Sequence, residues 1–370
     1  MVTAQPLPTP RVLLGPGPSA VATSVLEALG RAPVGYLDPE LFEALADIQA
    51  GLRTLFGTAN PFTLALTGTG MAAMESCFAN LLEPGDAAVI GVNGFFGERM
   101  AEIAARYGAR VTCVDAPWGE PLDPERLDRA AAAAGTPRIV ACVHAETSTG
   151  VRQPLEPVAR VARAHGALLV VDAVTSLGGL PVQVDEIGID ACYSASQKCM
   201  GCPAGLAPIS VSERAWRVVE GRRTKVTCWY YDWQLLRRYW SAEHAYHHTV
   251  PGNLLAALRE ALRRMREEGL PERYGRHQAV SDRLLEGLAA LDIHPFAREG
   301  YRLPTLNAMA LPEGLDDAAV RRRLLVDYGI EIGGGLGELK GRVWRIGTMG
   351  ESATPRNVEM LLGALGRVLA

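Results

Sequence analysis

The sequence has no marked excess of charge and no long hydrophobic run, and both features limit what the protein can bind. Its 370 residues carry 37 lysines and arginines and 41 aspartates and glutamates, which gives a net charge of −4. Nucleic acids and anionic membranes attract basic proteins, so neither is expected as a partner. No run of about 18 apolar residues is present to cross a bilayer. Because the first residues lack a basic start and an apolar core, we expect no signal peptide.

Cysteine is scarce, and its pattern argues against a disulfide framework. The seven cysteines are an odd number, and several lie in apolar strand or helix patterns, where reduced thiols are normally buried. Cys199 and Cys202 have a CxxC spacing, but no second Cys or His pair follows at the distance of a zinc site. We therefore expect no bound metal and a reducing compartment, the cytoplasm.

The hydrophobic pattern alternates between strands and helices over most of the chain. Such alternation predicts an α/β fold with a mainly parallel, seven-stranded sheet that is covered by helices on both faces. The expected strands are 62–66, 87–92, 110–114, 138–143, 168–171, 191–194 and 205–211, and the expected helices between them are 71–82, 98–107, 124–134 and 157–165.

The pattern changes after a long helical stretch at residues 254–268, where Gly269-Leu-Pro271 marks a boundary. The remaining hundred residues mix helices with a few short strands, which is typical of a smaller α+β domain. The final helix begins at Thr354-Pro355, an N-cap residue followed by proline at the first helical position. The expected parts are an N-terminal arm (1–16), a large domain (17–269) and a small C-terminal domain (270–370).

A carboxylate and a lysine are predicted at the ends of two neighbouring strands. Asp172 ends one apolar strand, and the next strand delivers Lys198 into a turn rich in glycine and proline. Ligands of open α/β sheets bind outside the carboxyl ends of the strands. Pyridoxal 5′-phosphate requires such a pair, because a lysine forms a Schiff base with its aldehyde and an acid keeps its pyridine nitrogen protonated. The alternative is a solvated lysine in a loop and an aspartate that caps a helix.

The segment Thr67-Gly-Thr-Gly-Met71 lies between an expected strand and an expected helix. Glycines allow close approach to a ligand, and the free N–H groups of a helix start attract phosphate. The spacing also resembles a dinucleotide-binding fingerprint. That alternative requires an acid at the end of the second strand, whereas strand 87–92 ends in Asn93-Gly94. The sequence therefore favours a phosphate site.

Two further segments follow expected strands and should line the same sheet edge, namely Asn93-Gly-Phe-Phe-Gly97 and His144-Ala-Glu-Thr-Ser-Thr-Gly150. An aromatic ring there can stack on a pyridine ring, and a threonine hydroxyl can reach its oxygen. The alternative for Phe95 and Phe96 is core packing, and we expect one of them to pack in this way.

Taken together, these motifs resemble the class V pyridoxal-phosphate-dependent aminotransferases, in particular the alanine–glyoxylate and serine–pyruvate or serine–glyoxylate aminotransferases. The resemblance covers nearly the whole chain and implies the fold type I architecture and a homodimer with two active sites at the subunit interface. The motifs that carry it are Leu13-Leu-Gly-Pro-Gly-Pro-Ser19, Asn80-Leu-Leu-Glu-Pro-Gly-Asp86, Asn93-Gly94 with Gly97, Glu146-Thr-Ser-Thr-Gly-Val151, Val171-Asp-Ala-Val-Thr-Ser-Leu-Gly-Gly179, Ser196-Gln-Lys198, Tyr246-His-His-Thr-Val-Pro251, Gly333-Gly-Gly-Leu-Gly337 and Arg345-Ile-Gly347.

The resemblance assigns a role to each matching residue. Phe96 stands where some members have tryptophan, and Met71 stands where some have a polar residue, so no phosphate contact is assigned to Met71. The implied catalytic residues are Lys198 and Asp172; the implied cofactor contacts are Thr69, Gly70 and Gln197 at the phosphate, Phe96 on the ring, Thr147 at the ring oxygen, and Tyr246 and Thr249 from the other subunit; Arg345 would bind the substrate carboxylate.

The expected reaction is transamination between a small amino acid, alanine or serine, and a 2-oxo acid, glyoxylate or pyruvate. Related members use ureidoglycine or pyridoxamine as the donor. A cysteine desulfurase is disfavoured, because Gln197 replaces the histidine typical before the lysine and no cysteine follows Cys228. The sequence is also compatible with an aldolase-type enzyme or a non-catalytic binding protein. His247-His248 suggests a metal ligand or a general base, but no third ligand is suitably spaced and Lys198 already supplies a base.

Overall fold

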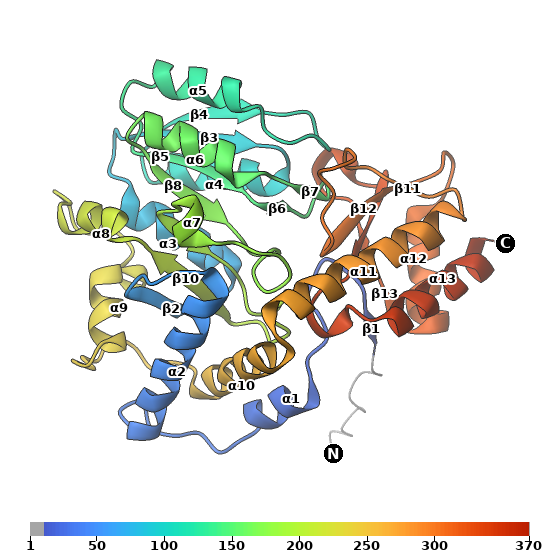
Figure 1. The fold of residues 1–370 in the computed structure, drawn as a ribbon, viewed down its shortest axis with the longest axis horizontal. Helices are drawn as coiled ribbons and strands as arrows, with labels where there is room; N and C mark the ends of the chain where they lie inside the picture. The colour runs from blue at the N-terminus through green and yellow to red at the C-terminus, as the bar shows by residue number, and fades with distance from the viewer. Residues whose placement is uncertain (1–10, 370) are drawn as a thin grey trace, which may run out of the picture.

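The computed structural model describes residues 11–369, so part of the expected arm, residues 1–10, lies outside the described chain. A seven-stranded sheet in the order β2-β10-β9-β8-β5-β3-β4 forms the centre of the larger part (Figure 1). Four of its six strand pairs are parallel, and β10 pairs antiparallel with both β9 and β2. The strands are β2 (Phe62–Thr67), β3 (Ala87–Val92), β4 (Arg110–Asp115), β5 (Ile139–Val143), β8 (Leu168–Asp172), β9 (Ala191–Tyr193) and β10 (Leu206–Val211).

The sheet confirms the predicted fold class, and every expected strand lies within one residue of its observed ends. Strands β3, β5, β8 and β10 are buried along their whole length, because helices cover both faces of a parallel sheet. This explains why they were recognisable as continuous apolar runs. Edge strand β4 is largely exposed.

The order of the strands determines where the helices and the ligand edge lie. The chain leaves β3 for β4 on one side and then crosses back over β3 to β5 on the other. Right-handed crossovers in opposite directions place their helices on opposite faces and open a crevice at the strand carboxyl ends. Helix α4 begins three residues before its expected start, at Phe95. The four expected helices are α3 (Gly70–Leu81), α4 (Phe95–Arg106), α5 (Pro124–Ala133) and α6 (Leu155–Ala164).

Several helices of the larger part were not predicted. Helix α2 has a clear start, since the Asp38 side chain accepts a hydrogen bond from the N–H of Glu40 and Pro39 occupies the first helical position. Ser212 caps the helix that follows β10 in the same way. These additional helices are α1 (Thr23–Leu29), α2 (Pro39–Phe56), α7 (Val184–Ile187), α8 (Glu213–Glu220), the 3₁₀ turn η1 (Trp229–Tyr231) and α9 (Trp233–Trp240).

The C-terminal part has its own antiparallel sheet, β11-β12-β15-β14, and its own apolar core beneath the helices. Helix α10 ends at Glu268 and α11 starts at Leu270, where the boundary was expected; the division into domains at this point stays a prediction. The elements are α10 (Gly252–Glu268), α11 (Leu270–Ala289), β11 (His294–Pro295), β12 (Leu306–Ala310), α12 (Asp317–Tyr328), β13 (Ile330–Glu331), β14 (Gly333–Gly334), the 3₁₀ turn η2 (Gly337–Leu339), β15 (Val343–Gly347), the 3₁₀ turn η3 (Gly350–Ser352) and α13 (Pro355–Leu369).

The N-terminal segment joins the two parts. Strand β1 (Val12–Leu13) pairs in parallel with β13, and the carbonyl of Leu14 accepts a hydrogen bond from the N–H of Gly347 at 2.8 Å. The next residues then run across the carboxyl edge of the large sheet to Ser19, whose N–H donates to the carbonyl of Gln197 at 2.9 Å. A short hairpin of β6 (Ala145–Glu146) and β7 (Val151–Arg152) lies after β5 at the same edge.

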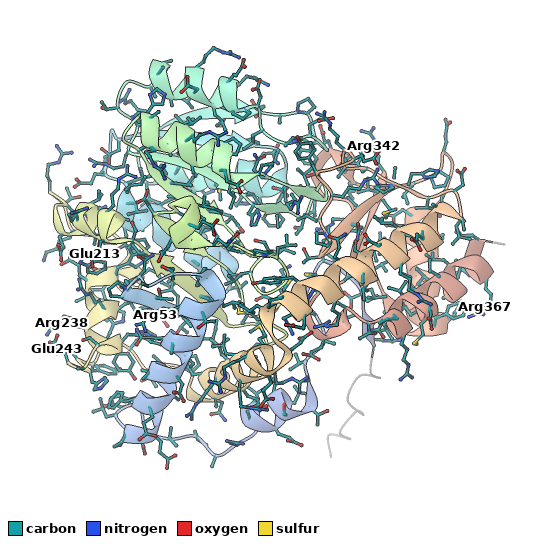
Figure 2. All side chains as sticks on the ribbon, in the orientation of Figure 1. Arg53, Glu213, Arg238, Glu243, Arg342 and Arg367 are labelled. Carbon is teal, nitrogen blue, oxygen red and sulfur yellow. The ribbon has the colours of Figure 1, made fainter. Side chains whose placement is uncertain are left out.

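Charged side chains occupy the outside of the molecule. Arg238, Glu243, Arg342 and Arg367 are exposed examples (Figure 2), and Arg238 pairs with Glu243 at 2.5 Å. Such pairs contribute little to stability, because water screens them. Within residues 11–369, no helix is long and apolar enough to span a bilayer.

Candidate active site

Asp172 lies at the carboxyl end of β8, opposite Tyr193 of the parallel strand β9. Its carboxylate is buried and accepts a hydrogen bond from the N–H of Val174 at 2.8 Å. Burial raises the pKa of Asp172 to about 7, and the charge of Glu146 acts in the same direction. The Val174 N–H and the charge of Lys198 oppose this rise. The structure thus brings Asp172 and Lys198 to one sheet edge, as the sequence predicted.

Lys198 follows β9 and extends along the N-terminal segment. Its amine donates a hydrogen bond to the carbonyl of Pro16, and a Cβ atom added at Gly17 would lie 2.5 Å from Nζ. Gly17 has a φ of +107°, so both its conformation and this contact require glycine. Burial lowers the pKa of Lys198 to about 8, which favours the nucleophilic neutral amine. The two other lysines, Lys225 and Lys340, are exposed.

Hydrogen bonds from distant segments fix the backbone around the lysine. The Ser19 hydroxyl donates to the carbonyl of Lys198 at 2.7 Å. The fully buried guanidinium of Arg273, on α11, donates to the carbonyls of Cys199 at 2.6 Å and Gly178 at 2.9 Å. Gly178 lies in the loop that follows Asp172, so one side chain connects the loops that carry the acid and the lysine. The sequence analysis did not identify Ser19 or Arg273 as part of the site.

The turn before α3 has the features of a phosphate site. Thr69 is the N-cap residue, but its side chain forms no capping hydrogen bond, which leaves the first N–H groups of the helix without side-chain partners. A Cβ atom added at Gly70 would lie 2.9 Å from Val174 and 3.3 Å from Ala195, so this turn packs closely on the loops after β8 and β9. The Oε1 atom of Gln197 is buried and has no hydrogen-bond partner among the described residues.

The first turn of α4 is held by two residues that the sequence analysis did not assign to the site. The buried carboxylate of Glu146 accepts hydrogen bonds from the N–H of Phe96 at 3.1 Å and from the hydroxyl of Ser148 at 2.6 Å. Ser148 in turn accepts from the N–H of Phe95 at 3.0 Å. These contacts explain why α4 starts at Phe95. Burial raises the pKa of Glu146, although these donors oppose the change.

Phe96 and Thr147 are the two residues predicted to contact the pyridine ring and its oxygen. Phe96 is half-buried and packs on the large core, and its ring meets that of Phe95 edge-on at 5.6 Å. Thr147 is buried beside Glu146. The stacking role of Phe96 and the hydroxyl role of Thr147 stay predictions.

Arg345 reaches the site from β15 in the C-terminal part. Its neighbour Trp344 faces the core of the C-terminal part, whereas Arg345 faces the large sheet and is only 8% exposed, so it is not a surface residue of the described chain. Its Nε donates to the carbonyl of Gly334 at 2.7 Å. Burial lowers the pKa of Arg345 to about 10, and the charge of Glu146 opposes this. Among the described residues it forms no ion pair, so its outer N–H groups are free for a carboxylate.

Tyr246 and Thr249 are not brought to the phosphate turn of their own chain. Tyr246 is 59% exposed, its ring lies 5.0 Å from that of Tyr36, and its hydroxyl is 3.5 Å from that of Thr249. Neither residue forms a hydrogen bond with Thr69, Gly70 or Gln197 within the described chain. Their contacts with the phosphate of another subunit stay a prediction.

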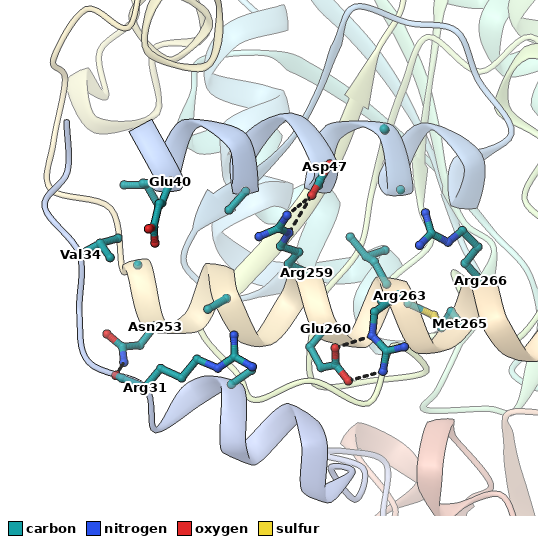
Figure 3. Close-up of a pocket in the computed structure, with 18 of the residues that line it drawn as sticks. Arg31, Val34, Glu40, Asp47, Asn253, Arg259, Glu260, Arg263, Met265 and Arg266 are labelled. Carbon is teal, nitrogen blue, oxygen red and sulfur yellow. Dashed lines mark hydrogen bonds and ion pairs between the residues drawn. The ribbon is translucent and has the colours of Figure 1, made fainter. Parts of the chain in front are cut away.

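A hollow of about 690 Å³ lies elsewhere, between α1, α2 and α10 (Figure 3). Its charged residues pair with one another, for example Arg259 with Asp47 and Arg263 with Glu260. None of the predicted catalytic or cofactor-binding residues lines it. The chemistry is therefore assigned to the sheet edge rather than to this hollow.

The residues at the sheet edge fit pyridoxal 5′-phosphate. The start of α3 and the Gln197 amide offer donors for a phosphate, and Lys198 offers an amine for the aldehyde. Asp172 offers a carboxylate for the pyridine nitrogen. Three buried polar atoms at this edge have no hydrogen-bond partner among the described residues: Oε1 of Gln197 and both amide atoms of Asn93. Such atoms are expected where a polar ligand binds.

Comparison with known proteins identifies the family. The chain matches Aminotransferase class-V over residues 28–337 and belongs to this family. It is 38% identical to the alanine–glyoxylate aminotransferase of Drosophila melanogaster, covering 100% of this chain and 95% of the relative. It is 37% identical to the (S)-ureidoglycine–glyoxylate transaminase of Bacillus subtilis, covering 97% and 90%. The crystal structure of an alanine–glyoxylate aminotransferase from Nostoc sp. superimposes with a TM-score of 0.97, at 49% identity, covering 100% and 98%.

The protein is therefore an enzyme, a transaminase of fold type I that uses pyridoxal 5′-phosphate. This confirms the predicted family, reaction type and cofactor. No group of three or more His, Cys, Asp and Glu side chains that could hold a metal ion occurs within residues 11–369.

Replacing Asp172 by asparagine should stabilise the cofactor-free protein at alkaline pH. The folded-state pKa of about 7 exceeds the ordinary value of 3.8, so wild-type stability falls as the pH rises from about 4 to 7. Asparagine carries no charge to bury, and one pKa unit corresponds to ~1.4 kcal/mol. We expect Asp172→Asn to gain about 1–4 kcal/mol over wild type at pH 8 and little at pH 4. Urea unfolding at both pH values measures this; identical pH profiles would contradict it.

Replacing Lys198 by alanine should leave a folded protein that binds pyridoxal 5′-phosphate without a covalent bond and has lost transamination. The phosphate and ring contacts remain, but the amine is gone. Borohydride treatment followed by denaturation should release the cofactor from Lys198→Ala and retain it on wild type. Lys225→Ala, at an exposed lysine, is the matched control and should behave as wild type. Near-normal turnover in Lys198→Ala would show that the lysine is misassigned.

Proposed function

We propose that this protein transfers the amino group of alanine or serine to glyoxylate or pyruvate. The observation that carries this proposal is the buried Arg345, which has no ion-pair partner in the described chain and faces Lys198 closely enough to lower its pKa. A planar guanidinium matches the carboxylate that all four compounds share. The relatives named as alanine–glyoxylate aminotransferases support glyoxylate as the acceptor.

Ureidoglycine is the second candidate donor. The relative from Bacillus subtilis that is named for this substrate matches 97% of the chain at an identity close to that of the Drosophila enzyme. A panel of amino donors with glyoxylate, assayed on purified protein, decides between them. A kcat/KM for ureidoglycine well above those for alanine and serine would replace the first proposal by the second.

Each residue then has a defined task. Pyridoxal 5′-phosphate held by these residues would supply an electron sink, which would allow the substrate α-carbon to release its hydrogen as a proton. Nζ of Lys198 accepts this proton, since its lowered pKa keeps a useful fraction of the amine neutral. The Asp172 carboxylate holds the positive charge of the pyridine nitrogen, and Arg345 fixes the substrate carboxylate.

We also propose a homodimer with shared active sites, as the resemblance implied. It is supported by the exposed Tyr246 and by the exposed Tyr36, whose ring lies 5.0 Å from it, together with the exposed Val34, Leu37 and Trp229, since such side chains are typical of interfaces. A cytoplasmic location is proposed as well; the seven free cysteines support it, and cell fractionation would test it.

Mixing two inactive variants tests the shared site. A dimer of one Lys198→Ala and one Tyr246→Ala subunit contains one complete site if Tyr246 acts across the interface. After subunit exchange, about half of the dimers are mixed, so activity should recover to about a quarter of wild type. If Tyr246 acts within its own chain, mixing restores nothing. Size-exclusion chromatography with light scattering should show a dimer for both variants.

Replacing Arg345 tests the substrate site. Arg345→Ala removes a charged hydrogen-bond pair, which should cost about 1.5–3 kcal/mol, or roughly ten- to hundredfold in kcat/KM. Donor and acceptor should suffer alike, because both carry the carboxylate. Arg345→Lys should recover only part of the loss, since an ammonium lacks the planar fork. Arg342→Ala, at an exposed arginine, is the control. If alanine and glyoxylate kinetics both stay within about twofold, the carboxylate binds elsewhere.

A further inference from the structure

His247 and His248 have no part in the function described so far. Both are buried, although they are adjacent in sequence, and both rings lie beside the turn that precedes the candidate phosphate site. Their environment is aromatic: the His247 ring stacks on Trp229 at 4.3 Å, and the His248 ring lies 4.6 Å from Tyr230. Within residues 11–369 they belong to no metal-binding group.

Three contacts join the pair into a continuous chain. Nε2 of His248 lies 3.0 Å from the hydroxyl oxygen of Thr67. Nδ1 of His248 lies 2.7 Å from Nδ1 of His247. Nε2 of His247 lies 3.3 Å from the carbonyl oxygen of Trp229. The chain therefore runs from the end of β2, through both imidazoles, to the 3₁₀ turn η1.

The last acceptor determines the direction of every bond. A carbonyl oxygen can only accept, so the proton on His247 must be at Nε2. A neutral imidazole then has a lone pair at Nδ1, and this atom must accept from the Nδ1–H of His248. Nε2 of His248 is consequently unprotonated and accepts from the Thr67 hydroxyl. For two neutral rings, this is the one arrangement of protons that satisfies all three contacts.

Thr67 is the residue through which this chain of hydrogen bonds reaches the phosphate turn. Its carbonyl accepts a hydrogen bond from the Tyr231 hydroxyl at 3.3 Å, so η1 holds its backbone directly, and its side chain is held by His248. The N–H of the next residue, Gly68, donates to the carbonyl of Gly205 at 2.9 Å. Thr69 and Gly70 follow directly and start α3. A displacement of Thr67 would move the N–H groups at the start of this helix.

We propose that His247 and His248 are positioning residues, which hold the phosphate-binding turn in place through a one-way chain of hydrogen bonds from Thr67 to Trp229. The proposal rests on the assignment of this turn to the cofactor phosphate, but not on which amino acid is the substrate. In this arrangement, an added proton at Nδ1 of His247 would leave two N–H groups facing each other across 2.7 Å, and one at Nε2 of His248 would reverse the hydrogen bond to Thr67.

The surroundings favour the neutral pair. Burial lowers the pKa of His248 to about 4, and the neighbouring His247 adds to this; burial also lowers the pKa of His247. The other titratable groups nearby are Tyr230, which contacts both rings, Tyr231 on Thr67, and Asp232, whose charge opposes the fall at His247. The one-way arrangement of protons is therefore complete at neutral pH and is lost as the pH falls toward the pKa values of the pair.

Nitrogen NMR of the holoenzyme labelled with ¹⁵N-histidine tests the proton arrangement. At pH 7, His248 should carry its proton on Nδ1, the less common tautomer, and His247 should carry its proton on Nε2. Spectra of His247→Asn and His248→Gln assign the signals among the seven histidines. A proton on Nε2 of His248, or a charged ring in either residue at pH 7, would overturn the proposal.

Affinity measurements test the positioning role. His248→Leu and Thr67→Val each remove the same hydrogen bond, so each should raise the Kd of the cofactor-free protein for pyridoxal 5′-phosphate, and for inorganic phosphate, by about tenfold. The double variant should be no weaker than His248→Leu, because that variant has already lost the bond to Thr67 as well as the bond to His247. His248→Gln, whose amide can replace Nε2 toward Thr67, should recover most of the affinity. His244→Leu is the control, since His244 stacks on Phe42 and does not contact Thr67.

The hydrogen bond between Thr67 and His248 can be removed from either residue, so the test does not depend on one variant. If His248→Leu fails to fold, Thr67→Val changes one half-buried hydroxyl to a methyl group and still breaks the contact. Unchanged Kd values in both variants, within about twofold, would overturn the positioning role. Failure of the donor panel to show activity with alanine or serine would instead overturn the proposed substrate and leave the phosphate affinities untouched.

Discussion

The site depends on a carboxylate and an amine that share one poorly hydrated space. Burial destabilises the charge on Asp172 and on Lys198 alike, and their mutual attraction offsets only part of that cost. Neighbouring strand ends bring the two residues together, but strand ends alone do not fix side chains. The surrounding hydrogen bonds do so: Ser19 and Arg273 hold the backbone near the lysine, and the N–H of Val174 holds the acid. Stability is given up at this edge so that both groups titrate near neutral pH.

The C-terminal part contributes to the site through two connections that are far apart in sequence. Arg345 reaches the sheet edge from β15, and the N-terminal segment runs from β13 to Lys198. The same strand β15 contacts both, since Gly347 donates to the carbonyl of Leu14. Arg345, Lys198 and the N-terminal segment are therefore connected through β15. A shift of the C-terminal part would move Arg345 together with the Pro16 carbonyl that accepts from Lys198.

The sequence predicted the seven strands well, because strands buried on both faces are continuous apolar runs. It also predicted Asp172, Lys198 and the turn at Gly70, since these follow strands directly. Helix α2 was missed although its cap at Asp38 was readable. Glu146 could have been noticed as an acid after a strand, but Arg273 could not: its contacts with Gly178 and Cys199 span 95 and 74 residues, and no local pattern encodes them. The pairing of the two histidines likewise follows from tertiary contacts.

The scarcity of lysine has a chemical consequence. Pyridoxal phosphate is a reactive aldehyde that adds to neutral amines, whereas guanidinium groups stay protonated. A lysine with a pKa of about 8 is neutral a few hundred times more often at pH 7 than one with the ordinary value of about 10.4. With only two exposed lysines, almost all of the positive surface charge is arginine. The aldehyde thus meets few competing amines on the surface. The selectivity of Schiff-base formation for Lys198 depends on the scarcity of surface lysines as much as on the lowered pKa of Lys198.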